Sequence, residues 1–279
     1  MTMVLRDGSA PARHSGSMTR PLLILAALLV AAPALGNDAG GTDTPSWLRT
    51  DRPAPPPHVN FTYVLEVEAT YAEGDDADET ATAVIEVDAT KPPGARATVI
   101  SRTDDTKDLT KIIDGVIEGL EDTDNTPERM AESFYCTLDA ENFDIVHEDA
   151  ERAVLKPDMA SMEAVMRKDG TPKRMARRLS ERLDGEIVLS KAQPGRVVSS
   201  RFHMTRPMKV MLIANIHAME LEQSCVPAPD GHQRSERLSM TTEVSAMGKD
   251  MRTGMEMRVR DLVPVTPAGA AMPGAEPAR

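Results

Sequence analysis

Strict alternation of apolar and polar residues near both ends of the sequence constrains the fold more than any other feature. From residue 61 to 71 every odd position is apolar and every even position except Val64 is polar, and from 238 to 246 the apolar side chains fall on even positions. A third run, 255–259, has the same period. Because successive side chains of a β-strand point to opposite faces, this period predicts strands with one buried and one solvated face. The runs therefore indicate an antiparallel sheet with one apolar face.

Shorter segments extend this predicted sheet. Strands are expected in TATAVIEVDA, KPPGARATVIS, FDIVHED, RAVLKP, EIVLSK and GRVVSSRFHM. Turns such as AEGDDADE, QPG, PAPDG and MGKDMRTG separate the strands, because glycine, proline and aspartate favour turn conformations. The strands thus lie on both sides of a middle region whose pattern is different.

The middle region has helical periodicity. Between residues 104 and 124 the apolar side chains recur every three or four positions, at Leu109, Ile112, Ile113, Val116, Ile117 and Leu120. Further helices are predicted to start near Thr126, Asp158 and Thr171. An apolar sheet face must be covered, and these helices are the available cover. The predicted fold class is α+β: a curved antiparallel sheet, a half-barrel-like meander, covered on its apolar face by a few central helices.

The segment PMKVMLIANIHAMELEQSC, residues 207–225, does not fit one regular strand. Leu212, Ala214, Ile216 and Ala218 are apolar on even positions, whereas Met219, Leu221 and Cys225 are apolar on odd ones. A strand cannot change faces in this way without a bulge or a different element. We expect a bend or a short helical turn before Ala214–Ala218, and a strand from there to Val226.

The first residues have the pattern of a secretory signal peptide. Arg20 precedes an apolar run, 21–36, that ends in small residues. The run is shorter than the roughly 20 residues that span a bilayer, and an uncleaved anchor is the alternative. No transmembrane span is expected in the mature chain, and the expected location is the periplasm, with secretion as the alternative. We divide the chain into a signal peptide (1–36), a Pro- and Gly-rich disordered linker (37–58), a single α+β domain (59–263) and a disordered tail (264–279).

The charge of the chain limits its partners. Residues 1–36 contain three arginines and one aspartate, so their removal changes the net charge from −12 to −14. Because the phosphates of nucleic acid repel such an acidic protein, we expect no nucleic-acid binding.

The chain has two cysteines, Cys136 and Cys225. In an oxidising compartment two cysteines most simply form one disulfide. The spacing contains no CxxC, which disfavours a redox-active pair or a zinc site. We therefore predict a structural disulfide, with two free thiols as the alternative.

The sequence contains no motif of a known catalytic or metal site. HExxH, the P-loop and GxGxxG are absent, and the folded part lacks GxSxG. The histidines of the predicted mature chain are dispersed: His58, His147, His203, His217 and His232. We predict no catalytic residue, no metal and no cofactor, and we favour a function other than catalysis.

Two further patterns suggest binding. The predicted helices near residues 158–185 carry a basic cluster in an otherwise acidic chain: Arg167, Lys168, Lys173, Arg174, Arg177, Arg178 and Arg182. This cluster suggests contact with anionic lipid headgroups or an acidic partner, and a merely solvated face is the alternative. Nine of the 18 methionines lie between Met204 and Met257. Together with histidines they could bind Cu(I), but their phase with the apolar face favours a place in the core.

The order of these elements resembles that of a known family. Hairpins, a helical middle, LDGEIVLSKAQPGRVVSSRF, PAPDG and a final hairpin follow one another as in the half-barrel of periplasmic outer-membrane lipoprotein carriers, and in uncharacterised bacterial envelope proteins. The resemblance implies an exported protein that holds a lipid or acyl chain between sheet and helices, with a lipid, a lipoprotein or an envelope protein as partner. The alternatives are a structural or protein-interaction module with a filled core, and a hydrolase without a recognisable motif.

Overall fold

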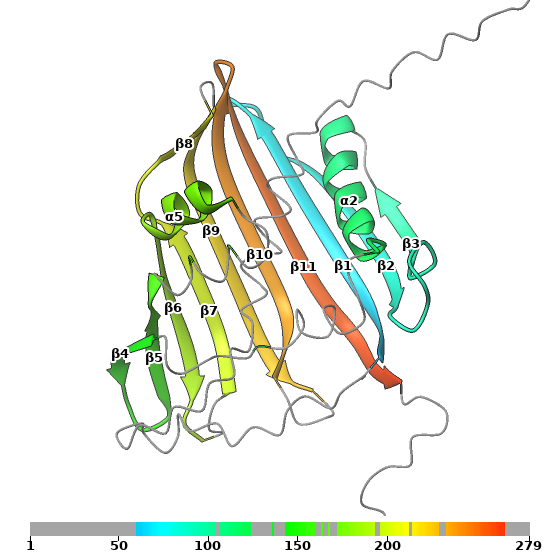
Figure 1. Ribbon diagram of the computed structural model, residues 1–279. Helices are drawn as coiled ribbons and strands as arrows, with labels where there is room; N and C mark the ends of the chain where they lie inside the picture. The colour runs from blue at the N-terminus through cyan, green and yellow to red at the C-terminus, as the bar shows by residue number, and fades with distance from the viewer. Residues whose placement is uncertain are drawn as a thin grey trace, which may run out of the picture.

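The computed structural model of the protein is dominated by one large antiparallel sheet (Figure 1). It describes residues 60–103, 106–123, 136, 143–159, 163, 167, 172–192, 196–211, 214–228 and 233–265. The elements of the first part are β1 (Asn60–Glu73), β2 (Glu79–Asp88), β3 (Ala97–Thr103), α2 (Lys107–Leu120), β4 (Phe143–Glu148) and β5 (Arg152–Pro157). Those of the second part are α5 (Lys173–Ser180), β6 (Leu183–Ser190), β7 (Arg196–Met204), β8 (Met208–Met211), β9 (Ala214–Pro227), β10 (Gln233–Ala246) and β11 (Lys249–Val265).

The strand order shows how the sheet is built. It runs β3-β2-β1-β11-β10-β9-β7-β6-β5-β4, and the short β8 also pairs with β9. From β4 to β11 the sheet is therefore a meander, as predicted, in which neighbours in sequence pair except that β7 and β8 both pair with β9. The N-terminal strands β1, β2 and β3 join this meander through β1, which pairs with β11 along almost its whole length. The first and last strands of the described chain thus lie side by side inside the sheet, third and fourth from the β3 edge.

The two edge strands, β3 and β4, do not pair with each other in the described residues, so the sheet stays open. Each edge strand carries a bulge, at Ile100 in β3 and at Val146 in β4. These bulged residues are 59% and 52% exposed. Bulges twist an edge away from further pairing, so both edges are protected against the addition of another strand.

One face of the sheet is polar, as the alternation predicts. Cross-strand ion pairs line it, for example between Arg260 and Glu66 at 2.9 Å and between Arg237 and Glu256 at 2.5 Å. Opposite charges on facing strands contribute a few tenths of a kcal/mol to about 1 kcal/mol each. These ion pairs therefore suit the solvated face of the sheet but add little to the stability of the protein.

Both described helices lie on the apolar face, at its two sides (Figure 1). The stripe predicted between residues 104 and 124 is confirmed, because α2 buries Leu109, Ile112, Ile113 and Val116 against β1 and β2. The carboxylate of Glu121, just after α2, accepts hydrogen bonds from the N–H groups of Gly94, Arg96 and Ala97 at the start of β3. This contact ties α2 to the loop between β2 and β3.

The helix predicted from Thr171 is present as α5, which is shorter than its sequence pattern and contacts β8. The helix predicted near Thr126 lies outside the described residues, as does most of the helix predicted near Asp158. Coverage of the apolar face by described helices is thus limited to β1 and β2 on one side and to the neighbourhood of β8 on the other.

The irregularity expected before Ala214–Ala218 is present in a different form. Residues 208–211 form the strand β8 instead of a helical turn, and β9 already begins at Ala214. The face change arises from a bulge at His217, because Glu243 pairs with Ala218 while Val244 pairs with Ile216. As expected, Cys225 then shares the buried face with Met219 and Leu221.

The predicted signal peptide, linker and tail lie outside the described residues, and the division into domains stays a prediction. Neither α2 nor α5 has the length and apolar character that a bilayer-spanning helix requires.

Candidate functional site: an apolar sheet face and a basic patch

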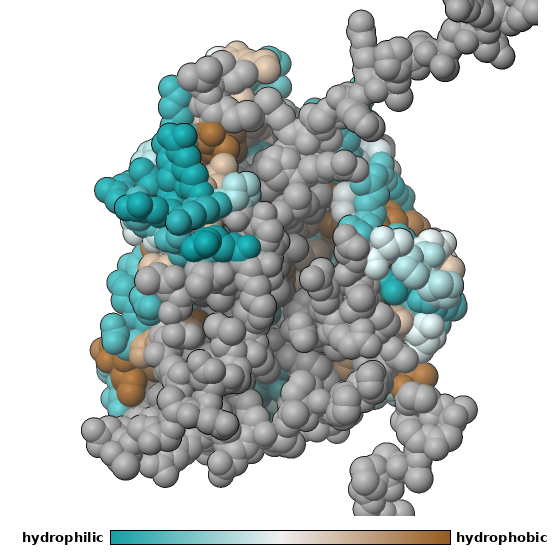
Figure 2. Space-filling view, in the orientation of Figure 1, coloured by the Kyte–Doolittle hydropathy of each residue, from teal (hydrophilic) through white to brown (hydrophobic). Residues whose placement is uncertain are grey.

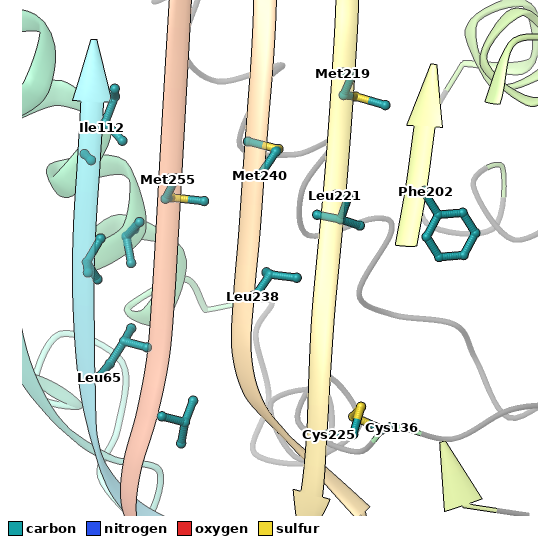
Figure 3. Close-up of a cluster of buried hydrophobic side chains, with 14 of the residues drawn as sticks. Leu65, Ile112, Cys136, Phe202, Met219, Leu221, Cys225, Leu238, Met240 and Met255 are labelled. Atoms are coloured by element: carbon teal, nitrogen blue, oxygen red, sulfur yellow. A yellow bond between two sulfur atoms is a disulfide. The ribbon is translucent and has the colours of Figure 1, made fainter. Parts of the chain in front are cut away.

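The central strands contribute a continuous set of apolar side chains to the buried face. Figure 3 shows Met255, Met240, Leu238, Met219, Leu221 and Phe202 in successive rows on β11, β10, β9 and β7. The strand registers bring Met240 directly opposite both Met255 and Leu221. Methionine is flexible and polarizable, so such rows adapt to apolar groups of varied shape.

The methionines and histidines do not come together. His203 and His217 are exposed, and the Nε2 atom of His217 lies 2.7 Å from the Ser245 hydroxyl. Met219, Met240 and Met255 are buried in the core cluster of the opposite face. The Cu(I) hypothesis therefore finds no support at these residues. Among the described residues, no group of three or more histidine, cysteine, aspartate or glutamate side chains could hold a metal ion.

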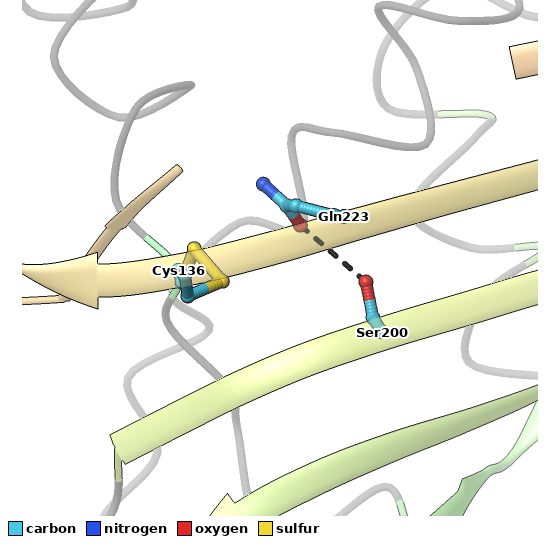
Figure 4. Close-up of a disulfide and its surroundings, with 4 residues drawn as sticks. Cys136, Ser200 and Gln223 are labelled. Atoms are coloured by element: carbon cyan, nitrogen blue, oxygen red, sulfur yellow. Dashed lines mark hydrogen bonds between the residues drawn. A yellow bond between two sulfur atoms is a disulfide. The ribbon is translucent and has the colours of Figure 1, made fainter. Parts of the chain in front are cut away.

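The predicted disulfide between Cys136 and Cys225 is present, with a Cα–Cα distance of 6.2 Å (Figure 4). The N–H of Cys136 also donates to the carbonyl oxygen of Gln233, at 3.0 Å. The chain that leaves α2 after Leu120 reaches β4 at Phe143, close to the opposite edge of the sheet. Cys136 is therefore a described point at which this connection is fixed to β9.

A few polar groups interrupt the apolar face. Thr242 is 1% exposed, and its hydroxyl has no hydrogen-bond partner among the described residues. Near the disulfide, the hydroxyl of Ser200 and Oε1 of Gln223 are 3.4 Å apart (Figure 4). Burial raises the pKa of the Tyr63 hydroxyl well above its usual range, so this residue stays neutral. The face thus carries hydroxyl and amide groups but no ionised side chain among these positions.

Two open depressions are formed largely by polar described residues, and the lining of the first includes Ser200 and Gln223. The first, of about 270 Å³, lies among polar residues of β7, β9 and β10, including Arg201, Glu222 and Arg237. The second, of about 370 Å³, lies beside the bulge at His217 and includes Arg252. Neither has the apolar lining that is usual for small-molecule sites.

The basic cluster predicted from sequence is distributed unevenly in the structure. Lys173, Arg174 and Arg177 are exposed on α5, and Arg177 pairs with Glu181 at 2.9 Å. Arg178 and Arg182 are partly buried and have anchoring contacts, to the carbonyl oxygens of Lys209 and Arg178 respectively. Arg167 is exposed, and Lys168 lies outside the described residues.

The structure adds a cation that sequence reasoning missed. The connection between β7 and β8 packs against the end of α5, where Thr205 N donates to the Arg182 carbonyl oxygen at 2.7 Å. Arg206, exposed on this connection, donates to the Glu181 carbonyl oxygen at 3.2 Å. These contacts join residues 23 and 25 positions apart, so they could not be read from local periodicity. Figure 2 shows the resulting gathering of hydrophilic side chains over α5.

Comparison with known proteins gives a weak structural resemblance. No family model and no curated protein matches the sequence. The chain is similar to a LolA superfamily protein from Nitrosomonas europaea, with 13% identity over 72% of this chain and 87% of that chain, and a TM-score of 0.22. It is also similar to MucB in complex with MucA(peri) (13% identity, 73% and 94% covered, TM-score 0.12) and to the Pseudomonas aeruginosa MucA/MucB complex (10%, 73% and 94%, 0.13). TM-scores this low do not establish a common fold, so function is argued below from this chain alone.

Proposed function

We propose that the protein is an exported, non-enzymatic binding protein of the bacterial envelope that holds an apolar ligand, such as a lipid or acyl chain, between its sheet and helices. The breadth of the apolar face carries this proposal. Buried apolar side chains extend from Ile85 in β2 to Leu155 in β5 without a charged residue in the central rows. At the usual strand spacing these eight strands span about 34 Å, which exceeds the length of an acyl chain.

The composition of the face supports an elongated, adaptable ligand. Its centre is rich in methionine, whose flexibility lets one site accept chains of different shape. The buried hydroxyl of Thr242 has no partner in the part of the chain that the structure describes. Buried polar groups are normally satisfied by a protein group, a water or a ligand, so this hydroxyl is suited to the polar end of an amphiphile.

Export to the periplasm, with residues 59–263 as one domain, is part of the same proposal. The apolar run 21–36 has the pattern of a signal peptide. The Cys136–Cys225 disulfide is consistent with this, because disulfides persist in oxidising compartments and are rare in the cytosol. N-terminal sequencing of the protein from the periplasmic fraction tests this part, and a retained segment 1–36 would contradict it.

The second candidate is a structural or protein-interaction module with a filled core. It is favoured by one observation: both described depressions have mainly polar linings instead of lying among the methionine rows. The presence of bound lipid separates the two candidates, because a protein with a filled core would be purified from the envelope without one.

Native mass spectrometry of the protein purified from its own envelope, followed by lipid extraction, is the decisive measurement. We expect a population with added mass that extraction removes. Met240→Trp would fill the apolar face and reduce this population, whereas Thr241→Trp, at the neighbouring exposed position, would leave it unchanged. Circular dichroism verifies that both variants fold. Unmodified mass in every preparation, with no uptake of added fatty acid, would favour the filled core instead.

A further inference from the structure

We propose that the basic patch formed by α5 and the β7–β8 connection docks the protein on an anionic membrane surface. The patch is defined by the exposed cations Lys173, Arg174, Arg177 and Arg206. Membrane docking goes beyond the binding of a ligand on the apolar face, because it uses a different surface and a different partner.

Charge distinguishes this patch from the rest of the molecule. Glu181 is the one acidic residue in residues 172–182, and it already pairs with Arg177. Lys173, Arg174 and Arg206 have no salt bridge among the described residues, unlike the cations of the polar sheet face, such as Arg201 and Arg260. In a chain of net charge −12, an anionic surface repels most of the protein and attracts this patch. The electrostatic field of the membrane therefore also turns the protein so that the basic patch faces the membrane.

Core packing and backbone contacts anchor the elements that carry the patch. Ala176 and Leu179 anchor α5 in the core, and Arg178 donates to the carbonyl oxygen of Lys209 on β8. The side chain of Arg206 also donates to the Glu181 carbonyl oxygen, which ties the β7–β8 connection to the end of α5. Several separate exposed cations on an anchored backbone suit a layer of phosphate headgroups better than a single bound anion.

An exposed apolar side chain at the same end of the sheet favours a membrane over an acidic protein. Met247, in the turn between β10 and β11, is 70% exposed. The register Lys209–Asn215–Ser245 places this turn two strands from β8, about 12 Å away by strand spacing and rise. Cations beside an exposed apolar side chain are the combination that binds at the interface of anionic bilayers.

Vesicle co-sedimentation of the full mature chain tests the proposal. Vesicles of phosphatidylcholine with about a third phosphatidylglycerol are compared with pure phosphatidylcholine, at ionic strengths of about 0.02 M and about 0.5 M. We expect binding to the anionic vesicles at low salt and loss of it at high salt. The triple variant Lys173→Gln, Arg174→Gln, Arg177→Gln should lower partitioning roughly a hundredfold, because each cation near such a surface contributes about fivefold.

A matched control removes three cations from the polar sheet face, in the variant Arg201→Gln, Arg252→Gln, Arg260→Gln. Its net charge equals that of the patch variant, but its partitioning should fall much less. Met247→Asn tests the apolar contact, because asparagine accepts the left-handed conformation of this residue, at φ 54°. It should weaken binding severalfold while the salt dependence stays unchanged.

Several outcomes would overturn the docking proposal: no sedimentation of the wild type at low salt, equal losses in the two triple variants, or binding to an acidic polypeptide such as polyglutamate without binding to vesicles. None of these bears on bound lipid in native mass spectrometry. Failure of the docking proposal is therefore distinguishable from failure of the proposed ligand-binding function.

Discussion

Removal of the Cys136–Cys225 disulfide should be one of the most destabilising changes in this protein. The two cysteines are 89 positions apart, so the bond closes a long loop of the unfolded chain. The chain-entropy relation for a loop of this length gives about 4.6 kcal/mol of lost stability. A domain of this kind has a total free energy of unfolding of about 5 to 15 kcal/mol. The loss is therefore a large part of the total.

Urea unfolding of the Cys136→Ala, Cys225→Ala double variant, followed by circular dichroism, measures this effect. At an m-value of about 2 kcal/mol per M, the midpoint should fall by about 2 M. The m-value itself should rise, because the unfolded chain is no longer constrained and exposes more surface. The reduced wild type keeps both buried sulfur atoms but lacks the closed loop. The difference between its free energy of unfolding and that of the double variant therefore gives the contribution of sulfur packing alone. If the double variant and the reduced protein unfold at the same urea concentration as the oxidised protein, the reasoning is wrong.

Three shorter predictions concern single side chains. Gly185→Ala should destabilise the protein by about 1 to 3 kcal/mol, because the added Cβ would lie 2.6 Å from Cε1 of Phe202; thermal melts should show Phe202→Leu relieving part of this loss. Thr242→Val should raise the free energy of unfolding in urea by about 1 to 2 kcal/mol, because it removes a buried hydroxyl without a partner, whereas Thr241→Val on the exposed side should have little effect. For Glu121, burial raises the carboxyl pKa, but the backbone N–H groups at the start of β3 lower it more, so the net pKa is depressed. The unfolded state then binds the proton more readily, so the stability from this group is present above the ordinary pKa of about 4.3 and is lost as pH falls through the lower folded value. Urea titrations at several pH values should show a smaller acid-dependent loss for Glu121→Gln than for the wild type.

Local patterns predicted most of the individual elements. The alternation between residues 238 and 246 has its counterpart in β10, where Leu238, Met240 and Thr242 are buried. The spacing of Leu109, Ile112 and Val116 likewise identified the buried face of α2. These predictions succeeded because the side-chain periods of strands and helices are set by backbone geometry and are visible within ten to fifteen residues.

Pairings between distant segments could not be predicted from local patterns. The pairing of β1 with β11 joins segments almost two hundred residues apart, and their alternation is compatible with many strand partners. The change of face near Ala218 could be detected, but a bulge at His217 and a helical turn leave the same mark on the sequence. The place of Arg206 in the basic patch could not be predicted, because its contact with the Glu181 carbonyl oxygen at the end of α5 exists only in the folded chain.

The topology explains how a broad face and a docking surface can coexist in one open sheet. The pairing of β1 with β11 joins the first and last strands inside the sheet, and the two edges, β3 and β4, are short strands with a bulge. Edges of that kind resist pairing with other chains, which would otherwise be the main hazard of a large open sheet. The surfaces left for specific contacts are then the apolar face and the ends of the strands. The basic patch lies at one such end, where α5 meets β8, and this position would let a membrane approach without displacing a strand.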